Sequence, residues 1–466
     1  MVMDSLKSCA CDIINALKED IVELEQPGNR RLLERFILPD SCGRTDNLFT
    51  RRTPLTFSLL LNFIMRHNPL STQISLNEFF DDIGHRPVTK SALSQKRTRL
   101  DPNVFVYLNR KFVLNCYNRI TDGMSQWHGW NLLACDGSNI ALPDTDSIAE
   151  YFRRHKYATN TGKAGETFPM AKVLMIYDVL NGITLCGSLN RDTDDERTML
   201  MDLLPEMLCM LPFETSRTIC LMDRGYFSLK IIDDMDRTGM KFVVRVQLSS
   251  SVVKNFISSG VRESVVEWKP SDHTSLTSDP EWKASGRESL RVRLVRVCLP
   301  DGQVEVLATN LDSEEVPASK MKELYFMRWP IEVEYLHYKH AFVIEAFSGG
   351  RPICVRQDFF ATILAHNMVR LMTVIAKDEV ERENRHRKLV YKSNMAILVG
   401  MFYAMFIEMM VLDQVYRCID ILYDTACKAL TPVRNGRKFK RKRKKHKSSD
   451  KNSDKNITRT NRKRVN

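Results

Sequence analysis

The chain has 466 residues with 43% hydrophobic and 27% charged side chains, so it is long enough for two or three domains with separate cores. Its twelve cysteines include no Cys-x-x-Cys pair, which argues against a zinc site or a disulfide framework and favours reduced thiols in an intracellular compartment. The net charge of +12 suggests a polyanionic partner, but this charge is concentrated at one end of the chain.

The C-terminal tail holds the excess of positive charge. From residue 434 onward there are 16 Lys and Arg against 2 Asp and Glu, whereas the remainder holds 53 basic and 55 acidic residues. A segment this polar cannot bury a core, so residues 431–466 are predicted to be a basic, disordered tail. Such a tail favours a non-specific arm for nucleic acid, and a solubilising end is the alternative.

Residues 1–125 are predicted to be helical. An apolar run follows the Thr-Pro pair at residues 53–54, as expected at the start of a helix. Further along, Gly84 and the Asp101-Pro102 pair separate three helical patterns. The order is therefore helix, glycine break, helix, Asp-Pro break, helix.

The middle helix of this series has a basic face. Lys90, Lys96 and Arg97 lie among serine and glutamine side chains, as in the second helix of a helix-turn-helix reader of DNA. These three residues are therefore candidate DNA contacts, and residues 1–125 a candidate DNA-binding domain. A small helical bundle with a solvated basic face explains the same pattern equally well.

Residues 126–249 change to strands that end in turns and alternate with helices, which predicts a mixed α/β sheet. Asn181-Gly182 separates two apolar runs and is a strong hairpin signal. The expected strands cover residues 130–137, 171–179, 182–190, 216–223 and 240–248, and the expected helices cover 195–211 and 229–239.

Residues 250–312 interrupt this order with three alternating polar and apolar segments, which predicts an antiparallel β insertion. Helices are expected again over 313–430, where they complete the core. The segment 395–412 is apolar apart from Glu408, and a buried helix is favoured over a membrane span because a carboxylate in the bilayer is costly. The N-terminus has acidic residues where a signal peptide needs an apolar core, so no secretory signal is expected.

Two carboxylates stand out in the α/β segment. Asp136 and Asp223 each end a predicted strand and are followed by Gly or Arg-Gly, and ligands collect at this edge of open α/β sheets. Two neighbouring Asp side chains repel each other unless a cation neutralises them. Mg²⁺ accepts a few carboxylate oxygens and completes its shell with water and phosphate, so a magnesium site is predicted here.

The segment 323–342, ELYFMRWPIEVEYLHYKHAF, offers a third carboxylate. Taken as one helix at about 100° per residue, Tyr325, Arg328, Glu332 and Lys339 fall within about 60° of arc, which suits a surface that faces phosphates. Glu334 points to the other side and is the weaker candidate. The proline is predicted to start or kink the helix, which makes the phase of Tyr325 and Arg328 less certain than that of the other two. A surface ion pair between the Arg and the Glu four residues on is the plainer alternative.

The spacing Tyr, two residues, Arg, three, Glu, six, Lys resembles the signature of DDE transposases of bacterial insertion sequences, specifically the insertion sequence 4 family. The segments ACDGSNIALP (134–143) and LMDRGYFS (221–228) are similar to the family's two Asp segments. SALSQKRTRL (91–100) resembles an upstream segment of many members. The resemblance spans roughly residues 50–375, and the basic tail lies outside it.

This resemblance implies a ribonuclease H-like catalytic domain with a β-rich insertion before the Glu-bearing helix. It implies divalent-metal-dependent cleavage at the terminal inverted repeats of an element, followed by attack of the freed 3′-hydroxyl on target DNA. Two Mg²⁺ ions are expected, with Mn²⁺ as a substitute, held by Asp136, Asp223 and Glu332. The expected phosphate contacts are Tyr325, Arg328 and Lys339.

The same resemblance implies double-stranded DNA as the partner, a homodimer in the synaptic complex and a place in the bacterial cytoplasm at the nucleoid, away from membranes. Members that form a DNA hairpin hold a flipped base with an aromatic of the insertion, for which Trp268 and Trp282 are both candidates. Two alternatives remain open. One is an inactive or domesticated DNA-binding derivative, and the other is a ribonuclease H-like structure-specific nuclease.

Overall fold

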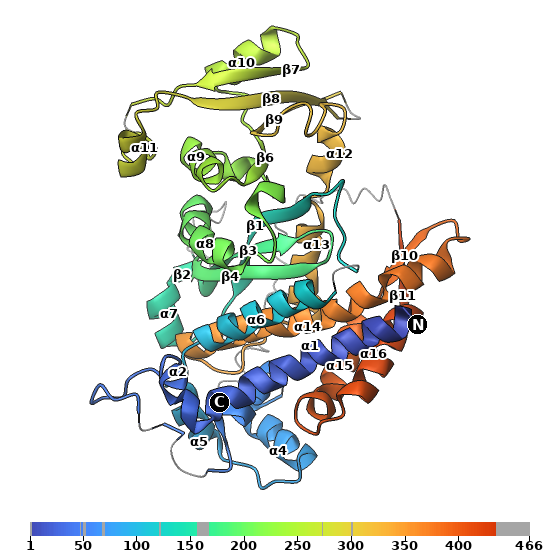
Figure 1. Ribbon diagram of the computed structural model, residues 1–466. Helices are drawn as coiled ribbons and strands as arrows, with labels where there is room; N and C mark the ends of the chain where they lie inside the picture. The colour runs from blue at the N-terminus through green and yellow to red at the C-terminus, as the bar shows by residue number, and fades with distance from the viewer. Residues whose placement is uncertain are drawn as a thin grey trace, which may run out of the picture.

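The computed structural model describes residues 2–46, 48–49, 53–67, 70–120, 123–155, 167–272, 274–299 and 302–434. Residues 435–466 of the predicted tail (431–466) lie outside these residues, and their disorder stays a prediction. The tail begins later than predicted, because β11 (Leu430–Val433) pairs with β10 (Val390–Ser393). A mixed sheet with helices on its faces forms the centre of the molecule, and a layer of helices lies below it in the view of Figure 1. The mixed α/β class expected from the sequence is confirmed.

The sheet has nine strands in the order β2-β3-β1-β5-β6-β9-β8-β7, with β4 paired to β3. Strands β1, β5 and β6 run parallel, while β3 runs antiparallel to β1 and forms the predicted hairpin with β4. Gly182 closes this hairpin at φ +75°, a conformation that glycine adopts without steric cost. The strands of this half are β1 (Asn131–Ala141), β2 (Arg154–His155), β3 (Phe168–Asp178), β4 (Ile183–Arg191), β5 (Thr218–Met222) and β6 (Lys241–Arg245).

The β insertion is present and antiparallel, as predicted, with β7 (Glu263–Trp268), β8 (Leu290–Cys298) and β9 (Val304–Thr309). It does not form a sheet of its own, because β9 pairs antiparallel with β6 and extends the central sheet. Two short helices that the sequence pattern did not reveal join these strands. They are α10 (Ser251–Ser258) and α11 (Pro280–Ser285).

The N-terminal part is helical, as predicted, and Gly84 breaks it at φ +70°. The helix expected at Thr53-Pro54 begins later, at Phe57, because the Thr56 hydroxyl caps it by accepting from the Leu59 N–H. The helices here are α1 (Val2–Glu25), α2 (Arg30–Glu34), α3 (Phe57–Met65), α4 (Thr72–Asp82), α5 (Lys90–Arg97) and α6 (Asn103–Arg119).

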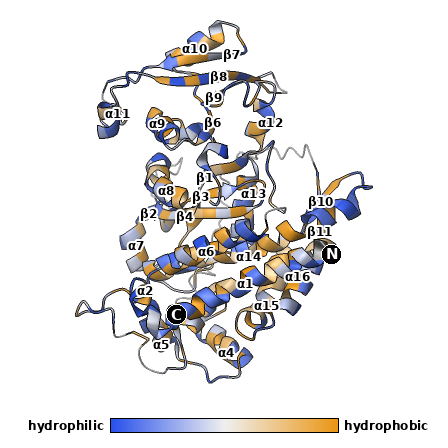
Figure 2. Cartoon of the chain, viewed as in Figure 1, coloured by the Kyte–Doolittle hydropathy of each residue, from blue (hydrophilic) through white to orange (hydrophobic). Residues whose placement is uncertain are grey.

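Helix α14 (Pro352–Asn384) runs below the sheet and packs against β4, α3 and α6. Helices α1 and α6 carry both hydrophobic and hydrophilic residues in Figure 2, as expected of helices that bury one face. The other helices beside the sheet are α7 (Asp146–Phe152), α8 (Glu196–Met210) and α9 (Leu229–Arg237).

The apolar segment 395–412 forms α15 (Met395–Met410), which packs against α16 (Val415–Lys428) and buries Leu398, Phe402 and Phe406. It is therefore a buried helix, as predicted. By length and composition, α14 alone among the described helices could cross a bilayer, and 89% of its apolar window is buried inside the protein.

Candidate active site

Asp136 and Asp223 lie side by side on neighbouring parallel strands. The register pairs Cys135 of β1 with Met222 of β5, so each aspartate is the next residue after this last pair. Neighbouring strands are about 4.8 Å apart, which brings the two carboxylates to one place on the sheet. Asp223 follows the end of β5, as predicted. Asp136 does not end its strand, because β1 continues to Ala141 through its pairing with β3.

The segment with the third carboxylate consists of three pieces rather than one helix. Helix α12 (Met321–Phe326) ends before Arg328, α13 (Pro330–Leu336) starts at the proline, and a π-helical turn covers His337–Ala341. Pro330 lies in the first turn, where its missing N–H costs no hydrogen bond. The prediction that the proline starts a helix is confirmed.

Arg328 lies between two of the three carboxylates. Its guanidinium donates to Glu332 at 2.8 Å and lies 3.6 Å from Asp136, and only 9% of the residue is exposed. Burial alone would lower the pKa of Arg328, but Glu332, Asp136 and Asp223 raise it. The fold thus gathers Arg328 and the three predicted acids around one point, with the guanidinium compensating their negative charge.

Asp136 and Asp223 differ in their pKa values. Burial raises the pKa of Asp136 to about 6, and the charges of Glu332 and Glu196 add to this effect. Burial acts in the same direction on Asp223, but the Arg224 N–H and the Arg245 guanidinium, at 2.8 Å, lower its pKa below the usual range. Asp223 is therefore the more acidic of the pair.

Tyr325 and Lys339 flank this centre on opposite sides. The Tyr325 hydroxyl donates to Asp223 at 3.3 Å, and burial raises the pKa of this phenol to about 12. The Lys339 ammonium donates to the Ser138 hydroxyl at 3.0 Å and the Asn139 carbonyl at 2.7 Å, next to Asp136 along β1. All six predicted residues of this site therefore lie close to the same part of strands β1 and β5.

Glu196 is a fourth acid of this region that the sequence pattern did not single out. It is the first residue of α8, and a Cβ added to Gly137 would lie 2.6 Å from its carboxyl carbon. The buried Tyr226 hydroxyl donates to Glu196 at 2.8 Å. Asp192, Asp194 and Asp195 are expected from the sequence to cap this helix, and Asp195 does so by accepting from the Thr198 N–H. The signal in the sequence that could have revealed Glu196 is its position directly after the capping residue Asp195.

Glu334 lies apart from these acids in a buried network. Its carboxylate is 4% exposed, forms an ion pair with Arg370, and accepts from His366 at 2.8 Å and from His337 at 3.1 Å. Arg370 and the two histidines lower the pKa of Glu334 against the effect of burial. Glu334 thus helps to attach α13 to α14.

The candidate DNA contacts of α5 occupy three different environments. Lys90 is exposed, whereas the Lys96 ammonium donates to the Thr53 hydroxyl at 2.6 Å and lies 4.7 Å from the centre of the Phe49 ring. Arg97 is 2% exposed and forms an ion pair with Asp358 at 2.7 Å. Lys96 and Arg97 are thus engaged within the fold, and of the three only Lys90 offers an unengaged charge at the surface.

Both candidate tryptophans of the insertion are buried. Trp268 is 7% exposed and lies 5.0 Å from the Phe227 ring. Trp282 is 5% exposed, with the Arg287 guanidinium 5.0 Å from its ring. Neither ring is open to a flipped base in this conformation.

The donor set of the site suits a divalent cation, because Asp136, Asp223 and Glu332 all offer carboxylate oxygens. Among the described residues, however, no group of three or more His, Cys, Asp or Glu side chains is close enough to hold a metal ion. The guanidinium of Arg328, between Asp136 and Glu332, supplies the compensating positive charge instead.

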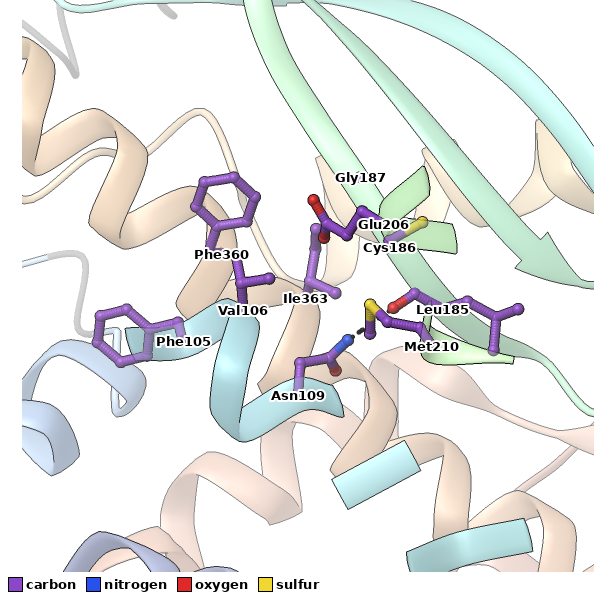
Figure 3. Close-up of a pocket in the computed structure, with 10 residues that line it drawn as sticks. All are labelled: Phe105, Val106, Asn109, Leu185, Cys186, Gly187, Glu206, Met210, Phe360 and Ile363. Carbon is purple, nitrogen blue, oxygen red and sulfur yellow. Dashed lines mark hydrogen bonds between the residues drawn. The ribbon is translucent and has the colours of Figure 1, made fainter. Parts of the chain in front are cut away.

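One cavity is too small to be a ligand site. It holds about 10 Å³, space for no more than one water, between α6, β4, α8 and α14. Figure 3 shows Asn109 at its edge, donating to the Leu185 carbonyl at 2.9 Å. Glu206 is the one acid in its lining, and burial raises the pKa of this carboxyl.

Comparison with curated proteins gives two relatives. The transposase InsG for insertion sequence element IS4 of Escherichia coli K12 is 24% identical over 295 residues, which covers 62% of this chain and 63% of the relative. The transposase for insertion sequence element IS231F of Bacillus thuringiensis subsp. israelensis is 25% identical over 169 residues, 27% of this chain and 35% of the relative. The chain thus spans less than two thirds of the length of these relatives.

Comparison with solved structures gives weak likenesses. A cryo-EM structure of the piggyBac transposase synaptic complex with hairpin DNA has a TM-score of 0.39 at 11% identity, with 79% of this chain and 74% of that chain covered. A crystal structure of a pre-cleavage Mos1 transpososome has a TM-score of 0.17 at 12% identity, with 54% and 83% covered. At these scores neither likeness carries an argument.

The family itself is shown by a family model described as a transposase DDE domain, which matches residues 127–368, more than half of the chain. The matched range begins just before β1 and contains Asp136, Asp223 and Glu332. The chain therefore belongs to the family of transposases with a DDE domain, and its resemblance to the insertion sequence 4 family is confirmed.

Proposed function

We propose that the chain is a cut-and-paste transposase with a ribonuclease H-like catalytic domain. It binds the terminal inverted repeats of its element, cleaves DNA at the ends and joins the 3′-hydroxyl ends to target DNA. The observation that carries this proposal is the placing of Asp136, Asp223 and Glu332 around Arg328, where α13 meets strands β1 and β5.

In this proposal Asp136, Asp223 and Glu332 would hold divalent metal, Mg²⁺ or Mn²⁺. When bound, a pair of such ions supplies activation of the attacking hydroxyl and stabilisation of the leaving oxygen in phosphodiester chemistry. The low pKa of Asp223 keeps this carboxylate ionised, and a cation favours ionisation of Asp136 as well.

The flanking cations and phenol orient the DNA. Arg328 and Lys339 would donate to phosphate oxygens on either side of the cleaved bond, and Tyr325 would donate to a third oxygen. Arg328 is suited to this task because it exchanges one set of anionic oxygens, those of Asp136 and Glu332, for another. When Arg328 binds a phosphate, it therefore releases Asp136 and Glu332 in the same step.

The partners in this proposal are double-stranded DNA and a second copy of the chain, since two element ends must be cut and joined together. The place of action is the bacterial cytoplasm, where the chromosome is. The basic tail from residue 434 would add sequence-independent affinity for DNA.

The test is cleavage of a linear DNA that carries the candidate element ends. We expect the DNA to be cut with Mg²⁺ or Mn²⁺ and to stay intact with EDTA. When a plasmid target is added, we expect products in which the element ends are joined to the plasmid. Glu332→Gln should abolish cutting while DNA binding remains measurable by mobility shift. Glu323→Gln, which changes an exposed acid of α12, is the matched control and should cut like the wild type. Cutting by Glu332→Gln would refute the assignment.

A further inference from the structure

A wide groove lies between the N-terminal helices and the catalytic core. It has a volume of about 890 Å³ and is far larger than the small cavity of Figure 3. One wall comes from α4 and α5, and the other from the start of α7, the turn before α14 and the start of α14. Its lining residues are Ser71, Thr72, Gln73, Lys90, Ser91, Leu93, Ser94, Gln95, Arg97, Thr98, Thr145, Ser147, Ser348, Gly349, Gly350, Arg351 and Cys354.

This lining is positively charged and rich in hydroxyl groups. Lys90, Arg97 and Arg351 are its charged residues, and none of the lining residues is acidic. Asp358, which is not a lining residue, compensates the charge of Arg97 through an ion pair. Lys90 and Arg351 are exposed, and no acid of the described chain lies within ion-pair distance of either side chain. Two positive charges are therefore free to meet an anionic ligand.

The two walls are joined by hydrogen bonds, so the groove is preformed. Arg97 of α5 donates to the Ser348 hydroxyl at 2.6 Å and to the Cys354 carbonyl at 3.3 Å. On the far wall, the Thr145 and Ser147 hydroxyls donate to the Gly350 carbonyl at 2.7 and 3.0 Å. A ligand that enters here meets walls that these hydrogen bonds already hold in place, which lowers the entropic cost of binding.

Two chain segments connect this groove to the candidate active site. Strand β1 runs from Asp136 to Ala141 and leads on to Thr145. The segment after α13 runs beside it, because Lys339 donates to Asn139 and the Ala141 N–H donates to Glu345 at 3.0 Å. Cations lie at both ends of this connection, two beside the carboxylates and two in the groove. They are Arg328, Lys339, Arg351 and Lys90.

We propose that this groove binds the sugar-phosphate backbone of duplex DNA next to the point of cleavage. The proposal rests on the proposed function, since it places the DNA that the carboxylates would cut. Lysine, arginine, serine and threonine side chains are the usual phosphate contacts in protein–DNA complexes, and they supply most of this lining. Sites for small molecules are mostly apolar, whereas Leu93 and Cys354 are the main apolar residues here.

The test compares DNA affinity across salt concentrations. The double variant Lys90→Glu/Arg351→Glu of the full chain is titrated against a fluorescent duplex that carries an element end, in EDTA so that no cutting occurs. We expect the Kd to rise at least about tenfold at low salt, and the slope of log K against log salt to shrink by about 2, as for the loss of two phosphate contacts. Duplexes without the element sequence should lose affinity to a similar degree.

Lys388→Glu is the matched control, because Lys388 is exposed and lies beyond the far end of α14 from the groove. Because α14 has 33 residues and a helix rises about 1.5 Å per residue, Lys388 lies about 50 Å from the groove. Ser94→Asp adds one negative charge to the α5 wall, where the hydroxyl makes no hydrogen bond within the described chain, and should also weaken binding. Thermal unfolding checks that each variant folds.

The proposal fails if the groove variants keep the wild-type salt slope and Kd, or lose no more affinity than Lys388→Glu. Failure of the proposed function has a different outcome. A protein that binds the duplex through the groove but never cuts with metal would leave the groove assignment standing. If the wild type cuts DNA but the groove variants bind DNA like the wild type, the groove assignment is refuted and the proposed function is supported.

Discussion

The carboxylate of Glu196 occupies the space that a side chain on Gly137 would need, 2.6 Å from the position of its Cβ. Two segments of the candidate active site meet at this contact, because Glu196 also accepts from Tyr226, which follows Asp223 along the chain. A glycine directly after Asp136 is thus needed to leave room for this carboxylate.

We therefore expect Gly137→Ala to displace Glu196 and leave the buried Tyr226 hydroxyl without its acceptor, at a cost of about 1–3 kcal/mol in the free energy of unfolding. Urea denaturation measures this loss. Gly225→Ala is the matched control, since no atom lies within 4 Å of its added Cβ. The double variant Gly137→Ala/Glu196→Ala should be more stable than the sum of the two single losses predicts. If the losses in stability of the two single variants simply add in the double variant, the two residues do not compete for space.

Arg328 neutralises acids that a metal ion would also neutralise. Arg328→Ala should increase the affinity for Mg²⁺ or Mn²⁺, because Asp136 and Glu332 would then be left without their cation. Metal at saturating concentration should raise the Tm of this variant by a few degrees more than that of the wild type. Lys320→Ala, which removes an exposed cation paired with Glu323, should show the wild-type shift. An equal shift in all three proteins would contradict competition between Arg328 and metal.

Glu334→Gln should be far more harmful than the sequence suggested. The helical pattern turns Glu334 away from Glu332 and predicts activity near wild type for the amide, but the structure buries Glu334 against Arg370. Removing one partner of a buried pair costs about 3–5 kcal/mol, because the other charge remains buried. Urea denaturation should show this loss, and Glu381→Gln, an exposed acid of α14, should show almost none. Loss of DNA cutting in Glu334→Gln would then reflect unfolding, which a matching drop in Tm identifies.

Stability should depend on pH through His366, which is fully buried. Burial lowers the pKa of His366 below its ordinary value of about 6.5, so the folded histidine stays neutral where the unfolded one takes up a proton. The unfolded state then binds more protons, so stability is complete above about pH 6.5 and falls as the pH drops toward the folded pKa, by up to about 1.4 kcal/mol per unit.

His366→Gln cannot titrate, and its free energy of unfolding should change less between pH 7 and pH 5.5 than that of the wild type. Its stability at pH 7.5 should still be lower, because the imidazole also stacks on Tyr338 at 4.4 Å. His85→Gln, at an exposed position, should keep the wild-type slope. A wild-type slope in His366→Gln would assign the pH dependence to other groups.

Local signals in the sequence were sufficient for much of the fold. The Asn181-Gly182 turn predicted the β3–β4 hairpin, and Pro330 predicted the start of α13, because both act through their own backbone. Asp136 and Asp223 could be placed together because parallel neighbours bring equivalent strand positions to one edge. The end of β1 was misplaced, since its extension depends on pairing with β3, which the local pattern does not record.

Contacts between residues that lie far apart in the chain could not be predicted from the sequence. Nothing near Arg97 reveals Asp358, its ion-pair partner in α14, so its position on a basic helix favoured a DNA contact. The buried partners of Glu334 could not be predicted for the same reason, because Arg370 and His366 lie more than thirty residues further along. Charges that pair across the fold cannot be told from surface charges by helical spacing alone.

The pairing of β9 with β6 limits how this protein could be shortened. Strands β7, β8 and β9 look like a detachable module in the sequence, yet their removal would leave β6 as an open sheet edge prone to pair with other chains. It would also take Glu305 from Arg245, the residue that holds Asp223. A shortened form of this chain would therefore have to keep this segment.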